Sequence, residues 1–252
     1  MTGKEAGHKF LARLGKTRLR PGGRRATEWL LDHAALGADS EVLEVACNMG
    51  TTAIAVAQRY GCHITGVDMD AEALARARQN VAARGLQSRV TIAQADALHL
   101  PYPDASFDVV INEAMLTMYA DKAKSRLVAE YFRVLKPGGR LLTHDIMFPR
   151  AQGVEEVLAQ MRRAINVNAQ PMTLAGWRAL MEDGGFARVE TLNGAMTLLS
   201  PRGLLYDEGV GGTLKILSRA LRAENRSMFW RMFRTFRRNS DRLNFIAICS
   251  EK

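Results

Sequence analysis

Hydrophobic and polar positions along the chain follow two spacings, one typical of helices and one typical of buried strands. Apolar residues at helical spacing predict helices over 27–36, 51–60, 70–85, 121–135 and 173–186. Short, nearly continuous apolar runs predict strands over 40–47, 63–69, 89–96, 107–114, 140–148, 187–194 and 243–251. Asp70 and Thr173 stand at N-cap positions, and glycines end the same two helices.

The order of these elements indicates the fold. Strict alternation of strand and helix favours right-handed crossovers and a parallel sheet with helices on both faces. The last two strands need no crossover helix between them, so they can pair antiparallel at one edge. We therefore expect an α/β fold: a Rossmann-like, doubly wound, mostly parallel seven-stranded sheet with an antiparallel last strand.

Two segments fall outside this alternation. Residues 195–242 separate the last two strands and are too long for a hairpin loop, so they predict a helical cap insertion. Residues 1–27 predict a basic arm or lid, with a short helix, a turn at Pro21 to Gly23 and the start of a second helix. The core would then comprise 28–194 and 243–252.

Positive charge is concentrated in these two segments. The net charge is +9, and Lys and Arg gather in 1–25 and 219–242, whereas 26–190 is much nearer balance. Such asymmetry fits an anionic partner, whether nucleic acid, a lipid headgroup or an acidic substrate. A solvated basic surface explains it equally well.

The remaining composition points to the cytoplasm. Cys47, Cys62 and Cys249 show neither disulfide pairing logic nor metal-ligand spacing, so no metal site is expected. The basic start lacks the apolar core of a secretory signal. No apolar run is long enough to predict a membrane span, although association with a membrane surface stays open.

A turn with one glycine follows the first strand, at the edge of the sheet where doubly wound folds bind ligands. It reads "VLEVACNMGTT" from Val42 to Thr52. The dinucleotide pattern G-x-G-x-x-G, aligned on Ala46, would need glycine at 46, 48 and 51, and none is present. A Walker lysine is absent too, so the sequence disfavours NAD(P) and nucleoside triphosphates.

The turn fits the pattern acidic-x-small-x-small-x-Gly over Glu44, Ala46, Asn48 and Gly50. It resembles motif I of the class I S-adenosylmethionine-dependent methyltransferases. "GVDMD", "QADALHLPYPDASFDVV" and "FRVLKPGGRLL" resemble further segments of that family in the correct order. The closest similarity in style is to small-molecule methyltransferases related to the ubiquinone and menaquinone biosynthesis enzymes. S-adenosylmethionine is then the implied cofactor, and S-adenosylhomocysteine the product.

The resemblance implies a role for each residue of a cofactor site. Asp68 would accept hydrogen bonds from both ribose hydroxyls and Met69 would pack on adenine. Asp96 and the amide of Ala97 would read the adenine amino group. The methionyl part would be held by these residues: Glu44, Ala46, Asn48, Gly50, Thr51, Thr52 and Asn112, with Arg18 or Arg20 from the arm meeting its carboxylate.

The reactive methyl group belongs to the cofactor, so the protein must mainly align the acceptor and exclude water. A general base is needed only if the acceptor loses a proton early. Candidates are Glu113, Tyr119, His144 and Asp145, although a purely structural His144 is equally compatible with the sequence. Cys47 is better explained as a small packing residue than as a catalytic thiol.

We favour methyl transfer by in-line displacement to a small molecule with an apolar body or an anionic group. An RNA methyltransferase and a degenerate cofactor-binding scaffold are the alternatives. "NEAM", after the fourth strand, lacks the N/D-P-P-Y/F pattern of amino-group methyltransferases, and no added RNA-binding module is present. The arginines and aromatics of 214–238 allow a substrate-covering cap, peripheral membrane contact or RNA contact.

Overall fold

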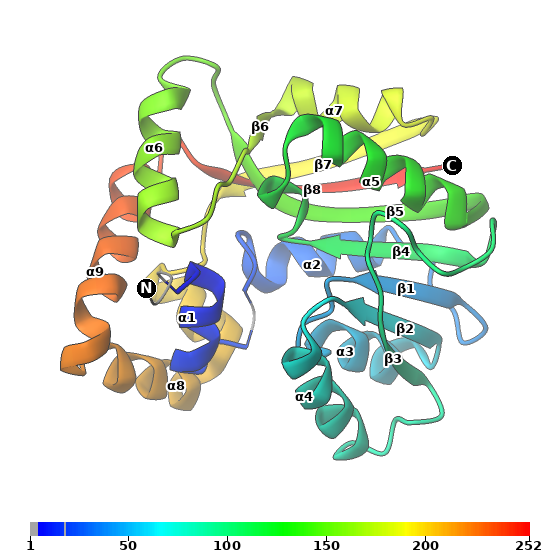
Figure 1. The fold of residues 1–252 in the computed structure, drawn as a ribbon, viewed down its shortest axis with the longest axis horizontal. Coiled ribbons are helices and arrows are strands. Elements are labelled where there is room, and N and C mark those ends of the chain that lie inside the picture. The colour runs from blue at the N-terminus through cyan, green and yellow to red at the C-terminus, as the bar shows by residue number, and fades with distance from the viewer. Residues whose placement is uncertain (1–4, 18) are drawn as a thin grey trace.

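The computed structural model describes residues 5–17 and 19–252, with one sheet at its centre (Figure 1). The strands are β1 (Glu41–Val45), β2 (His63–Asp68), β3 (Val90–Gln94), β4 (Phe107–Glu113), β5 (Leu135–Phe148), β6 (Met172–Thr173), β7 (Arg188–Ala195) and β8 (Asn244–Glu251). The helices are α1 (Gly7–Leu14), α2 (Gly23–Asp32), α3 (Thr51–Tyr60), α4 (Ala71–Ala82), η1 (Leu116–Met118), α5 (Asp121–Val134), α6 (Val154–Ile165), α7 (Leu174–Asp183), α8 (Pro201–Ala220) and α9 (Ala223–Arg238).

The sheet confirms the predicted class of fold. Its strands follow the order β3-β2-β1-β4-β5-β8-β7, and β8 is antiparallel to both of its neighbours while the other pairings are parallel. The predicted count of seven strands is wrong by one, because β6 pairs with β5 beside this order. Two residues before a helix are too few to produce a periodic signal.

Neighbouring residues of the central strands serve two different cores, because side chains alternate across a sheet. Leu43 and Val110 pack with α5 and α7 on one face. Val42 and Val109 pack with α2 and α3 on the other. Helices therefore cover both faces, and the turns that follow β1, β2 and β4 meet at one edge of the sheet.

A third apolar cluster joins α1, α6, α8 and α9 into one helical cap beside that edge (Figure 1). The arm and the insertion thus pack together, although they lie far apart in the sequence. Helix α6 was not predicted from the sequence, despite the helical spacing of its buried Val157, Met161 and Ala164. The predicted boundary after residue 27 falls inside α2. None of the described helices is both long enough and apolar enough to cross a membrane.

Candidate functional site

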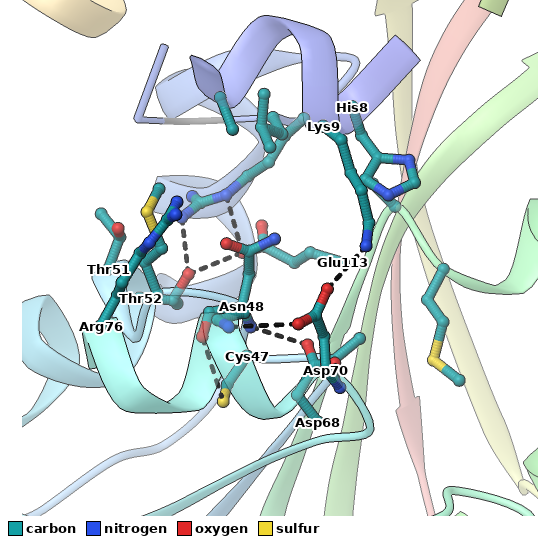
Figure 2. A pocket seen from close by; sticks show the side chains of 18 of the residues that line it. His8, Lys9, Cys47, Asn48, Thr51, Thr52, Asp68, Asp70, Arg76 and Glu113 are labelled. Atoms are coloured by element: carbon teal, nitrogen blue, oxygen red, sulfur yellow. Dashed lines mark hydrogen bonds and ion pairs between the residues drawn. The ribbon is translucent and has the colours of Figure 1, made fainter. Parts of the chain in front are cut away.

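A cavity of about 650 Å³ lies where β1, β2 and β4 end, with α1 over it (Figure 2). Ten residues predicted for the site line it: Arg20, Glu44, Ala46, Asn48, Thr51, Thr52, Asp68, Met69, Glu113 and Tyr119. Its roof comes from the arm and includes His8, Lys9, Arg13 and Arg20. The cavity therefore lies between the sheet and the arm.

The turn after β1 keeps a glycine-like backbone although two of its positions are not glycine. The φ angles of Ala46, Asn48 and Gly50 are 57°, 49° and 71°, all in the left-handed region. Asn tolerates this region, whereas an alanine there costs about 1–2 kcal/mol. Strained backbone of this kind concentrates at ligand sites, where the main chain must approach the ligand closely.

Replacing Ala46 with glycine is expected to raise the free energy of unfolding by about 0.5–1 kcal/mol. Relief of the left-handed strain should exceed the added entropy of the unfolded chain. Urea denaturation measures the change. The matched control is Ala55→Gly on the exposed side of α3, which should lower stability by about 1 kcal/mol. A destabilised Ala46→Gly protein would contradict the strain assignment.

Asp68, at the end of β2, holds the floor of the cavity together. Its two carboxylate oxygens accept hydrogen bonds from the backbone N–H groups of Asn48 and Asp70, each at 2.9 Å. A carboxylate has about four acceptor positions, so capacity remains for a diol. Next to it, the Met69 side chain is 62% exposed. A large apolar side chain left open beside a cavity suits a flat ligand surface such as adenine.

A salt bridge joins the roof of the cavity to its floor. Lys9 Nζ of α1 lies 2.7 Å from Asp70 Oδ2, and Asp70 also caps α4 by accepting from the amides of Glu72 and Ala73 (Figure 2). The sequence identified Asp70 only as a cap. No local signal reveals its pairing with Lys9, because the two residues are 61 positions apart.

The start of α3 and a buried arginine converge at the other end of the cavity. Arg20 Nη2 donates to Thr52 Oγ1 at 2.6 Å, and Arg20 Nε lies 2.9 Å from Glu113 Oε2. Gly50 precedes α3 and has no side chain to cap it, which leaves room for an anion at the first amides. This donor set fits a carboxylate. Arg18, the other predicted arginine, lies outside the described residues.

Below this point lie two buried glutamates whose pKa values are shifted in opposite directions. Burial, reinforced by the charge of Glu113, raises the pKa of Glu44 to about 8, although Glu44 accepts from the Ala53 amide at 2.8 Å. Burial would also raise the pKa of Glu113, but Arg20 and the hydrogen bond from His144 outweigh it and hold that pKa at about 2. At neutral pH Glu113 is therefore charged and Glu44 is mostly protonated.

The candidate bases are held by other groups. Both ring nitrogens of the fully buried His144 have partners: Nδ1 is 3.1 Å from Glu113 Oε1, and Nε2 accepts from the Gly22 amide at 2.9 Å. His144 could act as a base only if the arm moved away. Burial raises the pKa of Tyr119, so its phenol stays protonated. Asp145 is buried and accepts from the Thr117 amide. A general base stays a prediction.

Four residues predicted to bind the cofactor are not among the described residues that line the cavity: Gly50, Asp96, Ala97 and Asn112. Asp96 accepts from the Leu98 amide, and Asn112 is fully buried and donates to Tyr131 Oη at 3.0 Å. Their cofactor contacts stay predictions. Burial raises the pKa of the Cys47 thiol, which favours packing over catalysis.

Comparison with known proteins shows which proteins this chain is similar to. A methyltransferase domain model matches residues 42–139. An uncharacterized protein of Haemophilus influenzae is 55% identical over 252 residues, which cover 100% of both chains. The demethylmenaquinone methyltransferase of Thermus thermophilus is 38% identical over 127 residues, which are 50% of this chain and 54% of that one. The chain spans about half the length of the curated methyltransferases it matches.

Among solved structures, the chain resembles a geranyl diphosphate C-methyltransferase from Streptomyces coelicolor, solved with Mg²⁺, geranyl diphosphate and S-adenosylhomocysteine. The TM-score is 0.66, with 20% identity over 90% of this chain and 78% of that one. At this identity the similarity supports the fold alone.

Proposed function

Since the chain belongs to the S-adenosylmethionine-dependent methyltransferases, we propose that it transfers a methyl group to a small-molecule acceptor enclosed in the cavity under α1. The observation that carries the proposal is that the two ends of one cavity suit the two ends of the cofactor. Asp68 and Met69 suit a nucleoside at one end, and Arg20 with the start of α3 suits a carboxylate at the other. The volume lies within the roughly 300–1,000 Å³ typical of small-molecule sites.

The remaining wall of the cavity is largely apolar and indicates which kind of acceptor would fit. Met115, Met118 and Tyr119 line the cavity after β4, and Leu19 of the arm also lines it. Methionines adapt to irregular apolar shapes. We therefore propose an acceptor with an apolar body, aligned by this wall behind the methyl group for in-line displacement. When bound, the cofactor supplies the activated methyl group, and α1 excludes water from it.

The test uses the full chain with methyl-labelled cofactor and separate fractions of soluble metabolites, extracted lipids and RNA. Label should enter an organic small molecule, and Asp68→Ala should transfer little. Label confined to RNA would contradict the proposal in favour of an RNA methyltransferase. Absence of cofactor binding by calorimetry would favour a scaffold.

Cofactor binding at pH 7 is expected to release up to one proton. Glu44, with a pKa of about 8, is mostly protonated in the free protein. A cationic ammonium group held beside it would favour the carboxylate, so affinity should rise from about pH 6 to pH 8, by at most about tenfold per unit. Calorimetry in buffers of different ionisation enthalpy counts the protons. Glu44→Gln is the control and should lose the release. Equal release by both proteins would assign the proton elsewhere.

A further inference from the structure

The outer face of α8 carries an apolar stripe. Val210, Leu214, Leu217 and Leu221 are 68%, 62%, 37% and 61% exposed. Their spacing of four, three and four residues places them on one side of the helix. A neighbouring side of the helix is anchored, because Ile216 and Ala220 are buried in the cap. Single exposed leucines are ordinary, but a continuous stripe of them marks an interaction site.

The surroundings of the stripe are strongly basic. Within 201–242, nine lysines and arginines are exposed, whereas only Glu224 and Asp241 are exposed among the acidic residues. The nine are Arg202, Lys215, Arg222, Arg226, Arg231, Arg234, Arg237, Arg238 and Arg242. This surface therefore combines apolar area with charge of one sign.

The exposed face of α9 continues the pattern. Trp230 is 38% exposed, and the guanidinium of Arg234 lies 6.0 Å from its ring centroid. Arg226 and Arg237 stand four residues before and seven residues after Trp230, on the same face. Tryptophan and arginine both place an apolar body in lipid and a polar group in the headgroup layer.

We propose that the corner formed by α8 and α9 docks on an anionic lipid surface, with the α8 stripe entering the acyl boundary and the arginines contacting headgroups. A basic amphipathic helix with an exposed apolar face has this behaviour. A second copy of the chain on this patch would bring two sets of like charges together. RNA would use the arginines but would leave the leucines of α8 in water.

The docked corner lies next to the roof of the cavity. Helices α1 and α8 pack in one apolar cluster, and Arg219 Nη1 of α8 donates to the carbonyl of Leu14 in α1. In Figure 1, α8 and α9 form the outer corner of the cap, on the side away from the sheet. Binding there leaves the sheet and its active-site turns free. The proposal does not depend on methyl transfer.

Vesicle co-sedimentation of the full chain tests the proposal, with phosphatidylcholine vesicles compared against equal parts phosphatidylcholine and phosphatidylglycerol. The protein should sediment with the anionic vesicles only, and less at high salt. Leu214→Ser/Leu221→Ser should lower the apparent affinity at least about tenfold, and Arg222→Gln/Arg226→Gln several-fold.

The matched control is Arg84→Gln/Arg89→Gln, which removes two exposed arginines next to β3 and should bind like the original protein. Unchanged cofactor affinity in every variant confirms that each one is folded. Equal binding to both vesicle types, an equal loss in the control, or full binding by the leucine variant would overturn the proposal. So would a dimer in solution that the leucine variant dissociates while vesicles capture nothing.

Discussion

Replacing Asp68 with alanine is expected to weaken S-adenosylmethionine binding at least about tenfold, or about 1.4 kcal/mol. Two charge-assisted hydrogen bonds to a ribose diol contribute roughly 1.5–3 kcal/mol each. The same carboxylate also accepts from the Asn48 and Asp70 amides, so its loss loosens the turn that is predicted to contact the cofactor. Both effects act in the same direction.

Isothermal titration of cofactor into the original and altered proteins measures this change. Asp183→Ala removes an exposed carboxylate at the end of α7 and should leave the affinity unchanged. Asp68→Asn keeps one acceptor oxygen and should fall between the two. If Asp68→Ala bound cofactor normally while remaining folded, the ribose assignment would be wrong.

The sheet and the turn after β1 were predictable because their signals are local. Each core strand is an apolar run beside a turn, and alternation along the chain fixes a parallel order. The turn after β1 was recognisable because Glu44, Ala46, Asn48 and Gly50 keep the acidic-x-small-x-small-x-Gly spacing. The structure then places Ala46 and Asn48 in the same left-handed region as Gly50.

The roof of the site could not be predicted, because it depends on contacts between distant segments. Lys9 meets Asp70, and the Gly22 amide meets His144. His144 illustrates the consequence. It was a candidate base from the sequence, yet it lies within β5, where the arm uses one ring nitrogen and Glu113 the other. Only the folded arrangement of the arm against β4 and β5 shows this.

A buried network under the arm couples the arm to the edge of the sheet that lines the cavity. Arg20 comes from the arm, Glu113 ends β4, and His144 lies in β5. The side chains of Arg20 and Glu113 are only 9% and 7% exposed, so water solvates neither charge well and each depends on the other. An arm displaced from the sheet would leave a buried carboxylate without its cation. The pair therefore favours the arm packed against the sheet.

Replacing Arg20 with methionine is therefore expected to lower the free energy of unfolding by about 3–5 kcal/mol at neutral pH. The pKa of Glu113 is lowered from 4.5 to about 2, so its stabilisation is present above about pH 4.5 and is lost as the pH falls toward 2. Without Arg20, burial becomes the main influence and raises that pKa. The variant should then lose stability as the pH rises above about 4.5, and its deficit should be smaller at pH 5 than at pH 7.5.

Urea denaturation at these two pH values measures the deficit. The control is Arg59→Met, which breaks the 3.0 Å pair with Asp32 on the surface, where the side chains are 49% and 60% exposed. It should cost at most about 1 kcal/mol. Arg20→Met/Glu113→Gln removes both charges and should be more stable than Arg20→Met alone at pH 7.5, because no carboxylate is then buried without a partner. A deficit below about 1 kcal/mol, or one independent of pH, would show that the pair does not hold the arm against β4.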